Sequence, residues 1–244
     1  MGQQRVYRQA LGNPHLAGYR VRVKETDLWV QTETPLDALV RELVIRCRGY
    51  LESYISDHPG FLSAMRPVPV SGPVPGIIRD MADAAYAAGV GPMAAVAGAV
   101  AEYVGMALLE VSAEVMIENG GDIFVKLDNP FTLAIDAGKS PFSYKIGLQL
   151  DASSHPLGVC TSSGTIGHSF SYGQADAVCV VSDSCALADA SATAICNQVS
   201  AAADIDRAIA AGRRIEDVSA IVVIVGDRIG VWGDTSIVPL TSRE

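Results

Sequence analysis

Residues 115–127 read Val115-Met116-Ile117-Glu118-Asn119-Gly120-Gly121-Asp122-Ile123-Phe124-Val125-Lys126-Leu127, and the character of the chain changes at this segment. Two apolar runs flank the sequence Asn-Gly-Gly-Asp. Adjacent glycines favour a tight turn there because they adopt positive φ at little steric cost. The segment therefore predicts a β-hairpin whose strands are 115–117 and 123–127.

Strands continue after this hairpin. Short apolar runs bounded by turn residues predict strands at 131–135, 146–150, 157–160 and 177–181, and a last hairpin formed by 221–225 and 229–232. Two helices are expected among them. The first spans 184–200, with Ser182 or Ser184 as its N-cap, and the second spans 205–211.

Before residue 113 the chain is mainly helical. Alternating apolar and charged residues predict an N-terminal hairpin over 19–32 with its turn at 24–27. Thr34 is expected to cap a long amphipathic helix that has Pro35 at its first position and ends near 58–60. Five of the twelve prolines lie in 59–76, which predicts an irregular connection, and helices are expected over 77–88 and 91–109.

Helices cluster early and strands cluster late, which favours an α+β fold with a largely antiparallel sheet and packed helices. We expect one domain over residues 1–244. It would consist of N-terminal strands (1–34), a helical part (35–109) that contains the irregular loop 59–76, and a strand-rich part (113–240) with the helix 184–200.

The charge of the chain is negative and uneven. The formal net charge is -9; residues 1–50 hold eight Lys/Arg against five Asp/Glu, and the remainder holds ten against twenty-two. Such an acidic protein is a poor candidate for nucleic-acid binding, which needs clustered cations. A small anionic ligand is still compatible, because backbone N–H groups and helix N-termini bind phosphate without net positive charge.

The cysteines and the apolar segments bear on cellular location. The five cysteines are Cys47, Cys160, Cys179, Cys185 and Cys196. Their number is odd and no CxxC pair occurs, so we expect reduced thiols packed as small hydrophobes, as in a reducing cytosol. The N-terminus has no apolar signal core, and the apolar run 90–109 is broken by Pro92, several glycines and Glu102. These features predict a cytoplasmic protein without a membrane partner.

The strongest local signal for a site is Ala188-Asp189-Ala190-Ser191-Ala192-Thr193-Ala194. Asp189 and Thr193 are four residues apart, so on a helix they share one face. A carboxylate and a hydroxyl together suit a hard cation such as Mg²⁺. A purely structural interpretation competes with this one, because a carboxylate near a helix N-terminus is stabilising and a threonine can bond back to a helix carbonyl.

A second signal is the polar segment 160–169, which follows an apolar strand and contains Thr161, Ser162, Ser163, Gly164 and His168. Its hydroxyls, glycines and backbone N–H groups could cradle an anion. It is neither a Walker loop nor a nucleophile elbow. His168 could contact a phosphate or transfer a proton. The competing interpretation is an ordinary polar loop with a surface histidine.

The turn at Asn119-Gly120-Gly121-Asp122 is the third signal. A plain hairpin turn accounts for it. In a functional interpretation, the glycines allow a ligand to approach the backbone closely and Asp122 accepts a hydrogen bond from it.

In chain order, the turn at 119–122, the polar segment 160–169 and the motif at 188–194 resemble the ApbE superfamily, whose best-known members are FAD:protein FMN transferases. The last motif is the most specific, because members carry a closely similar Asp-Ala-x-Ala-Thr-Ala. The resemblance covers roughly residues 76–200. It implies a flavin nucleotide such as FAD as ligand, Mg²⁺ as cofactor, and transfer of FMN to a threonine of a target protein.

The resemblance also implies roles for individual residues. Asp189 and Thr193 match the side chains that hold the metal, and Ala94 matches the residue whose carbonyl completes the metal site. The segments Asn119-Gly120-Gly121-Asp122 and Thr161-Ser162-Ser163-Gly164 match regions beside the flavin nucleotide. His168 is the one histidine that can be offered for the family's His-Ile-Ile-Asp-Pro-x-Thr-Gly segment.

The chain departs from the family pattern at two points. Ala95 stands where the family has a lysine, so a cation near the ligand is missing, and the His-Ile-Ile-Asp-Pro segment is absent. Three hypotheses follow: a Mg²⁺-dependent transferase or hydrolase acting on a flavin or nucleotide diphosphate, a non-catalytic flavin- or nucleotide-binding protein, and a structural module with a degenerate site. A homo-oligomer is compatible with all three, since the Gly/Ala-rich segment 91–109 could form an interface.

Overall fold

The computed structural model describes residues 15–164, 173–233 and 235–240. Its centre is an eight-stranded sheet in which every neighbouring pair is antiparallel. From one edge to the other its strands are β1 (Ala17–Val23), β2 (Thr26–Thr32), β3 (Val115–Asn119), β4 (Asp122–Lys126), β7 (Leu157–Ser162), β8 (Ala177–Ser182), β9 (Val218–Val225) and β10 (Arg228–Gly233).

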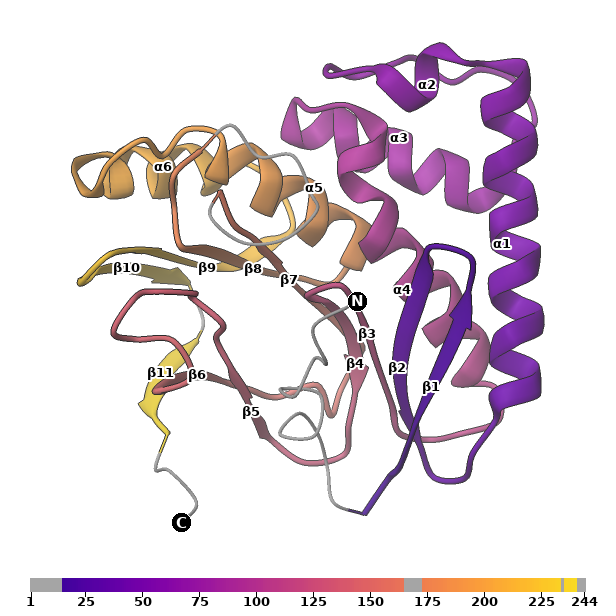
Figure 1. Ribbon diagram of the computed structural model, residues 1–244, viewed down its shortest axis with the longest axis horizontal. Coiled ribbons are helices and arrows are strands. Elements are labelled where there is room, and N and C mark those ends of the chain that lie inside the picture. The colour runs from indigo at the N-terminus through magenta and orange to yellow at the C-terminus, as the bar shows by residue number, and fades with distance from the viewer. Residues whose placement is uncertain (1–14, 165–172, 234, 241–244) are drawn as a thin grey trace.

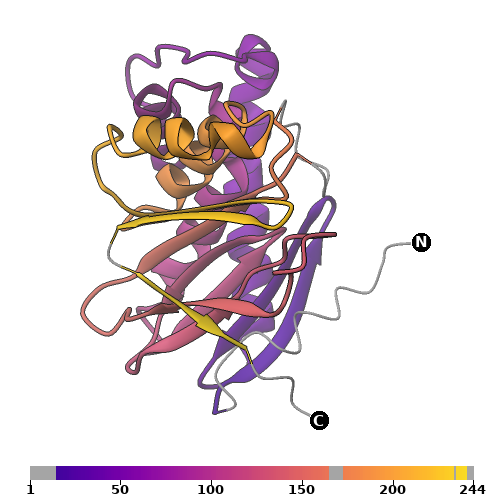
Figure 2. The same cartoon turned by 90° about the vertical axis from the view of Figure 1, so that its left-hand side faces the viewer.

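A second, smaller sheet lies against one face of the first (Figure 2). Its three antiparallel strands are β11 (Ser236–Pro239), β6 (Ile146–Leu150) and β5 (Phe131–Ala134). The sequence predicts β5 and β6 but neither β11 nor the division into two sheets. Four residues ending in a proline give too short a pattern to identify a strand.

The helices cover the other face of the large sheet (Figure 1). They are α1 (Asp37–Asp57), α2 (Gly60–Ser63), α3 (Gly76–Ala88), α4 (Val96–Leu108), α5 (Cys185–Cys196) and α6 (Ile205–Gly212), with two 3₁₀ turns, η2 (Pro92–Ala95) and η3 (Ala202–Asp204). The α+β architecture with an antiparallel sheet that the sequence predicts is therefore confirmed.

The large sheet is buried on both faces. In β9, Ile221 and Val223 belong to the core beneath the helices, whereas Val222 and Ile224 belong to the core between the two sheets. Successive side chains of a strand point to opposite faces. This arrangement explains why the central strands are continuous apolar runs rather than alternating ones.

The helix predicted over 91–109 is divided into two parts. Residues 92–95 form η2, and α4 begins only at Val96, because the backbone of Ala95 (φ -111°, ψ 2°) leaves the α-helical region. Pro92 can start a helical turn but has no N–H to donate to it. The consequence is a new helix N-terminus at residues 96–98, which the sequence pattern does not reveal.

The predicted cap of the first helix is wrong. Helix α1 begins at Asp37, and its N-cap is Leu36, without a side-chain hydrogen bond. Thr34 instead accepts a hydrogen bond at its carbonyl oxygen from the Thr32 hydroxyl (2.7 Å). The residue before a proline disfavours the helical region, so the chain turns once more before the helix starts.

Helix α5 ends four residues earlier than predicted. It ends at Cys196 rather than at residue 200. The next residues form other hydrogen bonds: Gln174 donates its N–H to the Val199 carbonyl (2.7 Å), and the Asp204 carboxylate accepts the N–H groups of Ser200 and Ala201. The cap at Ser184 is confirmed, since its hydroxyl oxygen accepts the Leu187 N–H.

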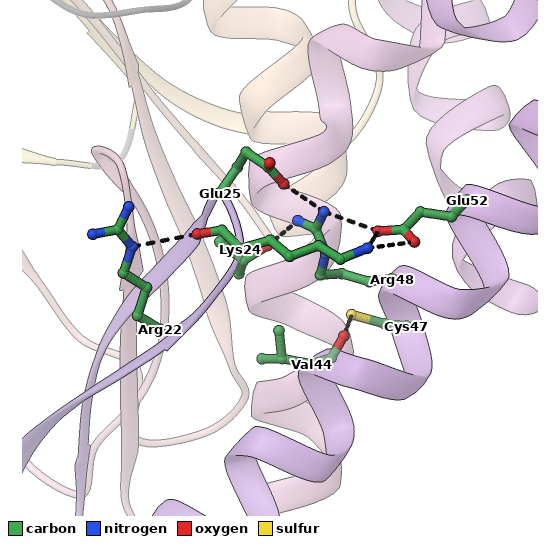
Figure 3. A network of polar contacts seen from close by, with 8 residues as sticks. Arg22, Lys24, Glu25, Val44, Cys47, Arg48 and Glu52 are labelled. Carbon is green, nitrogen blue, oxygen red and sulfur yellow. Dashed lines mark hydrogen bonds and ion pairs between the residues drawn. The ribbon is translucent and has the colours of Figure 1, made fainter.

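The turn of the N-terminal hairpin is clamped to α1 by ion pairs (Figure 3). Arg48 contacts Glu25 (2.6 Å) and Glu52 (2.9 Å), and Lys24 contacts Glu52 (2.8 Å). Arg48 also donates to the hydroxyl of Thr26 (2.9 Å), where β2 starts. These contacts fix the edge of the large sheet against the longest helix.

Two further sequence expectations concern the thiols and the membrane. All five cysteines are free and buried, as expected for packed thiols. Among the described residues no single helix is long and apolar enough to cross a membrane. The segments 76–88 and 92–108 pass such a test only as a pair, bent by 106°.

Candidate functional site

Helix α5 carries the two residues that the sequence predicts as metal ligands. Asp189 and Thr193 lie one turn apart and are both half-buried. The helix packs against β7 and β8 and against the helices α3 and α4. Its two polar side chains therefore lie at the border between the large sheet and the helical layer.

The carboxylate of Asp189 is bound to the N-terminus of α4. Its Oδ2 atom accepts a hydrogen bond from the Gly98 N–H (2.9 Å). This donor is one of the first N–H groups of the helix and has no partner within α4. A Cβ atom on Gly98 would collide with the Cys185 carbonyl oxygen and lie 2.8 Å from the Asp189 Cβ. Only glycine permits this close approach of α4 and α5.

The turn at Asn119–Asp122 lies beside the same helix end. Gly120 and Gly121 have φ of 73° and 113°, as the tight turn requires. Asn119 donates from its Nδ2 to the Ala97 carbonyl oxygen (3.0 Å), and the Asp122 side chain is only 7% exposed. The hairpin that the sequence predicts is confirmed, and it reaches the start of α4.

The two carboxylates influence each other. Burial raises the pKa of Asp189 to about 7, although the N–H groups of Gly98 and Ala97 favour the charged form. Burial raises the pKa of Asp122 well above its ordinary value, and the neighbouring charge of Asp189 raises it further. Two buried carboxylates so placed disfavour double ionisation, and a divalent cation would relieve that cost.

The hydroxyl of Ser162 has no hydrogen-bond partner in the part of the chain that the structure describes. Its side chain is 7% exposed and its Oγ atom is fully buried. Ser162 has the same parity on β7 as Cys160, which packs in the core under the helices, so it projects to the helix side of the sheet. An unpartnered buried hydroxyl is unfavourable unless a ligand completes its hydrogen bonds.

The rest of this turn lies against the C-terminal end of α5. The Gly164 N–H donates to the Ala175 carbonyl (3.0 Å), and a Cβ on Gly164 would collide with the Gly173 carbonyl. Gly173 is in turn closely packed on the carbonyl of Cys196. Ser163 donates from its hydroxyl to Ala175 at 3.5 Å. The segment 162–164 therefore lies beside the helix that carries Asp189 and Thr193.

One predicted residue points elsewhere. Thr161 faces the small sheet, where it lines a narrow cavity with Ile123, Leu133 and Cys179. The structure thus does not bring its side chain to Asp122 and Ser162, because successive residues of β7 face opposite sides. The backbone carbonyl oxygen of Thr161 nevertheless lies close to Gly121. A Cβ atom at position 121 would lie 3.6 Å from it.

Ala94 and His168 complete the predicted set. Ala94 lies in η2, which packs against α5, and it donates its N–H to the Gly91 carbonyl (3.0 Å). His168 lies outside the described residues. Within those residues no group of three His, Cys, Asp or Glu could hold a metal ion. The predicted metal ligands would offer oxygen atoms only, namely a carboxylate, a hydroxyl and a carbonyl, which are the ligand types of a hard cation.

Glu102 is a polar neighbour of the site that the sequence pattern did not single out. Its carboxylate accepts hydrogen bonds at the start of α5, from the Ser184 hydroxyl (3.1 Å) and the Ala186 N–H (3.0 Å). The sequence carried one signal for this role: Glu102 is an acidic residue within a predicted helix of mostly small apolar residues.

A surface hollow lined by Val70, Arg79 and Tyr86 lies on the outer side of α3 and contains none of the predicted site residues.

Comparison with known proteins identifies the family. A family model described as "AbpE bacteria" matches residues 9–226. The chain belongs to this family. Among curated members, the UPF0280 protein of Methanococcus aeolicus is 40% identical over 80% of this chain and 81% of its own length. The UPF0280 protein of Methanocaldococcus jannaschii is 38% identical over 88% of this chain and 89% of its own length.

Solved structures share the ApbE fold at low sequence identity. The flavinyl transferase ApbE of Pseudomonas stutzeri has a TM-score of 0.57 at 15% identity and covers 89% of this chain and 94% of its own. The ApbE protein of Thermotoga maritima has a TM-score of 0.53 at 10% identity, over 88% of this chain and 96% of its own. The resemblance to the ApbE superfamily that the motifs indicate is therefore confirmed at the level of family and fold.

Proposed function

We propose that the protein is a Mg²⁺-dependent transferase or hydrolase acting on a flavin or nucleotide diphosphate. One observation carries the proposal. Asn119, Asp122, Ser162 and Asp189 come from three separate segments, and all lie between the helix side of the large sheet and the helices, around α4 and α5. Membership of the ApbE-type family and the structural likeness to the flavinyl transferase ApbE of Pseudomonas stutzeri support a flavin nucleotide as the ligand.

In this proposal Asp189 and Thr193 bind the cation, with the carbonyl of Ala94 as a third oxygen ligand. When bound, Mg²⁺ would neutralise negative charge on a diphosphate and on its leaving group. Asp189 accepts the Gly98 N–H at Oδ2, and the proposal requires that an oxygen of this carboxylate also face the ion. The Gly98 N–H thus sets the orientation of the Asp189 carboxylate before a ligand binds.

The nucleotide would lie along the turns 119–122 and 162–164. The buried Ser162 hydroxyl would donate to a ligand oxygen, which would satisfy the hydrogen bond it lacks. Asp122 would accept a hydrogen bond from the ligand, and its raised pKa reflects how little water reaches it. His168 would transfer a proton to the leaving group.

The test is incubation of the purified protein with FAD and Mg²⁺, followed by chromatography for FMN and AMP. Because the mixture contains no protein acceptor, water would attack the FMN phosphorus and AMP would leave. We therefore expect both products from the wild type and none from Asp189→Asn, which keeps the size of the side chain but removes its charge. Asp204→Asn is a matched control, because it removes a carboxylate that caps backbone N–H groups at η3. Equal turnover by wild type and Asp189→Asn would contradict the proposal.

A second candidate function is flavin binding without chemistry. The observation that favours it is Ala95, which stands where related transferases carry a lysine. Without the lysine, less positive charge is available to stabilise the negative charge that develops during transfer. A stoichiometric FAD complex in equilibrium dialysis, together with no FMN or AMP after prolonged incubation with Mg²⁺, would establish this function and exclude the enzyme.

A further inference from the structure

At the N-terminus of each of the helices α4 and α5, a backbone N–H donates to a carboxylate from the other helix. Asp189 of α5 accepts the Gly98 N–H at the start of α4, and Glu102 of α4 accepts the Ala186 N–H at the start of α5. Each helix therefore supplies the partner for N–H groups that the other cannot satisfy internally. Between the same two helices, Gly98 lies directly against the Cys185 carbonyl, so that a Cβ atom on residue 98 would collide with it.

The Glu102 contact is the more unusual of the two. Glu102 is half-buried, and burial raises the pKa of its carboxyl, while the N–H of Ala186 and the hydroxyl of Ser184 favour the charged form. The same Oε2 atom accepts both hydrogen bonds, at 3.0 Å and 3.1 Å. Ser184 is also the N-cap of α5, so Glu102 holds the residue from which this helix starts.

Asp189 lies one helical turn after this anchored start. Residues one turn apart in a helix are joined by backbone hydrogen bonds, so we expect a shift of the first turn of α5 to move Asp189 with it. Site geometry must be held to about 0.5 Å for a ligand set to function. The position of Asp189 against Gly98 thus depends on what fixes the start of α5.

We propose that Glu102 is a positioning residue of the candidate site, which holds α5 in the register that places the Asp189 carboxylate on the N-terminus of α4. The predicted effect of Glu102 on ligand binding rests on the proposed function. Its effect on the Asp189–Gly98 hydrogen bond is a property of the protein alone. The two effects can therefore be measured separately.

The experiment compares Glu102→Ala and Glu102→Gln with the wild type. The amide oxygen of Gln can still accept from Ala186 and Ser184, whereas Ala cannot. Asp204→Ala is the matched control, since Asp204 likewise accepts two backbone N–H groups, at 2.9 Å and 3.0 Å, but at η3. Glu102→Asp, which is shorter by one methylene, replaces Glu102→Ala if that variant does not fold.

The first readout is the exchange rate of the Gly98 amide proton, measured by NMR without ligand. We expect Glu102→Ala to raise this rate about tenfold, because a loosened α5 weakens the Asp189–Gly98 bond, and Glu102→Gln to stay within about threefold of the wild type. Asp204→Ala should lower the melting temperature without changing Gly98 exchange. Loss of stability in Glu102→Ala with unchanged Gly98 exchange would overturn the proposal and leave Glu102 as a simple cap.

The second readout is calorimetric titration with FAD in the presence of Mg²⁺. We expect about a tenfold weaker affinity for Glu102→Ala, with Glu102→Gln close to the wild type. Unchanged FAD affinity in Glu102→Ala would exclude an effect on the site. If the wild type binds no FAD, the proposed function fails, and Gly98 exchange alone still decides whether Glu102 positions Asp189.

Discussion

Asp189 has two roles to reconcile at the scale of a single residue. Its Oδ2 atom accepts the Gly98 N–H, and helix N-termini favour negative charge. Burial nevertheless raises its pKa to about 7, and the charge of Asp189 helps to raise the pKa of Asp122. The Oδ2 contact fixes this carboxylate on α4, and the metal-binding proposal requires that an oxygen of the same carboxylate also reach the ion.

Gly98 and Gly49 give a matched pair of substitutions. In Gly98→Ala the new Cβ would collide with the Cys185 backbone, so we expect a loss of about 1–3 kcal/mol in the free energy of unfolding. In Gly49→Ala, on α1, nothing lies within 4 Å of the new Cβ, and we expect a gain of about 0.5–1 kcal/mol. Urea denaturation measures both, and a stable Gly98→Ala variant would refute the close contact.

Ser162 allows stability and binding to be separated. Its buried hydroxyl has no partner among the described residues, so Ser162→Ala should leave the free energy of unfolding unchanged or raise it by up to about 1 kcal/mol. The same change should weaken FAD binding about tenfold if the hydroxyl donates to the ligand. A clear loss of stability in urea denaturation would show that the hydroxyl is already satisfied within the fold.

At the scale of elements, the start of α4 determines the site. A continuous helix over 91–109 would leave no free N–H groups at residues 96–98. The 3₁₀ turn η2 creates these donors and places them beside α5, where Asp189 accepts one of them. Asn119 contacts the same helix end from the hairpin. A break in one helix therefore brings together the first and the last of the three sequence motifs.

The burial of the Glu102 carboxyl between α4 and α5 predicts that the free energy of unfolding depends on pH. Burial raises the pKa of the Glu102 carboxyl above its ordinary 4.5, with the nearby charge of Asp80 adding to the rise. The folded state then binds the proton more tightly than the unfolded state, so stability falls as the pH rises from about 4.5 through the folded-state pKa.

Glu102→Gln lacks this titration and serves as the reference. The difference in the free energy of unfolding, wild type minus variant, should decrease as the pH is raised from 4.5 towards 8. Urea denaturation at a series of pH values measures it, and other titrating groups cancel in the comparison. A difference that grows with pH would mean that the hydrogen bonds from Ser184 and Ala186 outweigh burial.

At the scale of the whole molecule, the large sheet has helices on one face and the small sheet on the other (Figure 2). Its central strands are therefore among the most protected parts of the chain. Cys160 and Cys179 lie on neighbouring strands β7 and β8, one in each of the two cores.

The five buried thiols report on this protection. We expect none of them to react with a water-soluble disulfide reagent in the native protein, and all five to react in denaturant, because each is buried and free. Burial also raises the pKa of Cys47 and Cys179 to about 11, which further reduces the reactive thiolate. A thiol that reacts rapidly under native conditions would indicate local opening at its element.

The fold class, most elements and the family motifs follow from local sequence. The Asn-Gly-Gly-Asp turn, the apolar runs of the strands and the Ser184 cap are determined by residues that are neighbours in the chain, so their pattern could be read directly. The start of α1, the break before α4 and the end of α5 could not. They depend on hydrogen bonds and packing between distant segments, which outweigh local propensity.

The same division applies to the candidate site. Sequence alone determined the residue types, their order and the shared face of Asp189 and Thr193, because helical spacing is a local property. Only the tertiary structure decided that Thr161 turns to the other face, that Asp122 feels the charge of Asp189, and that Glu102 anchors α5. Such facts depend on residues far apart in the chain: the Ala186–Glu102 hydrogen bond, for example, spans 84 positions, which no local pattern encodes.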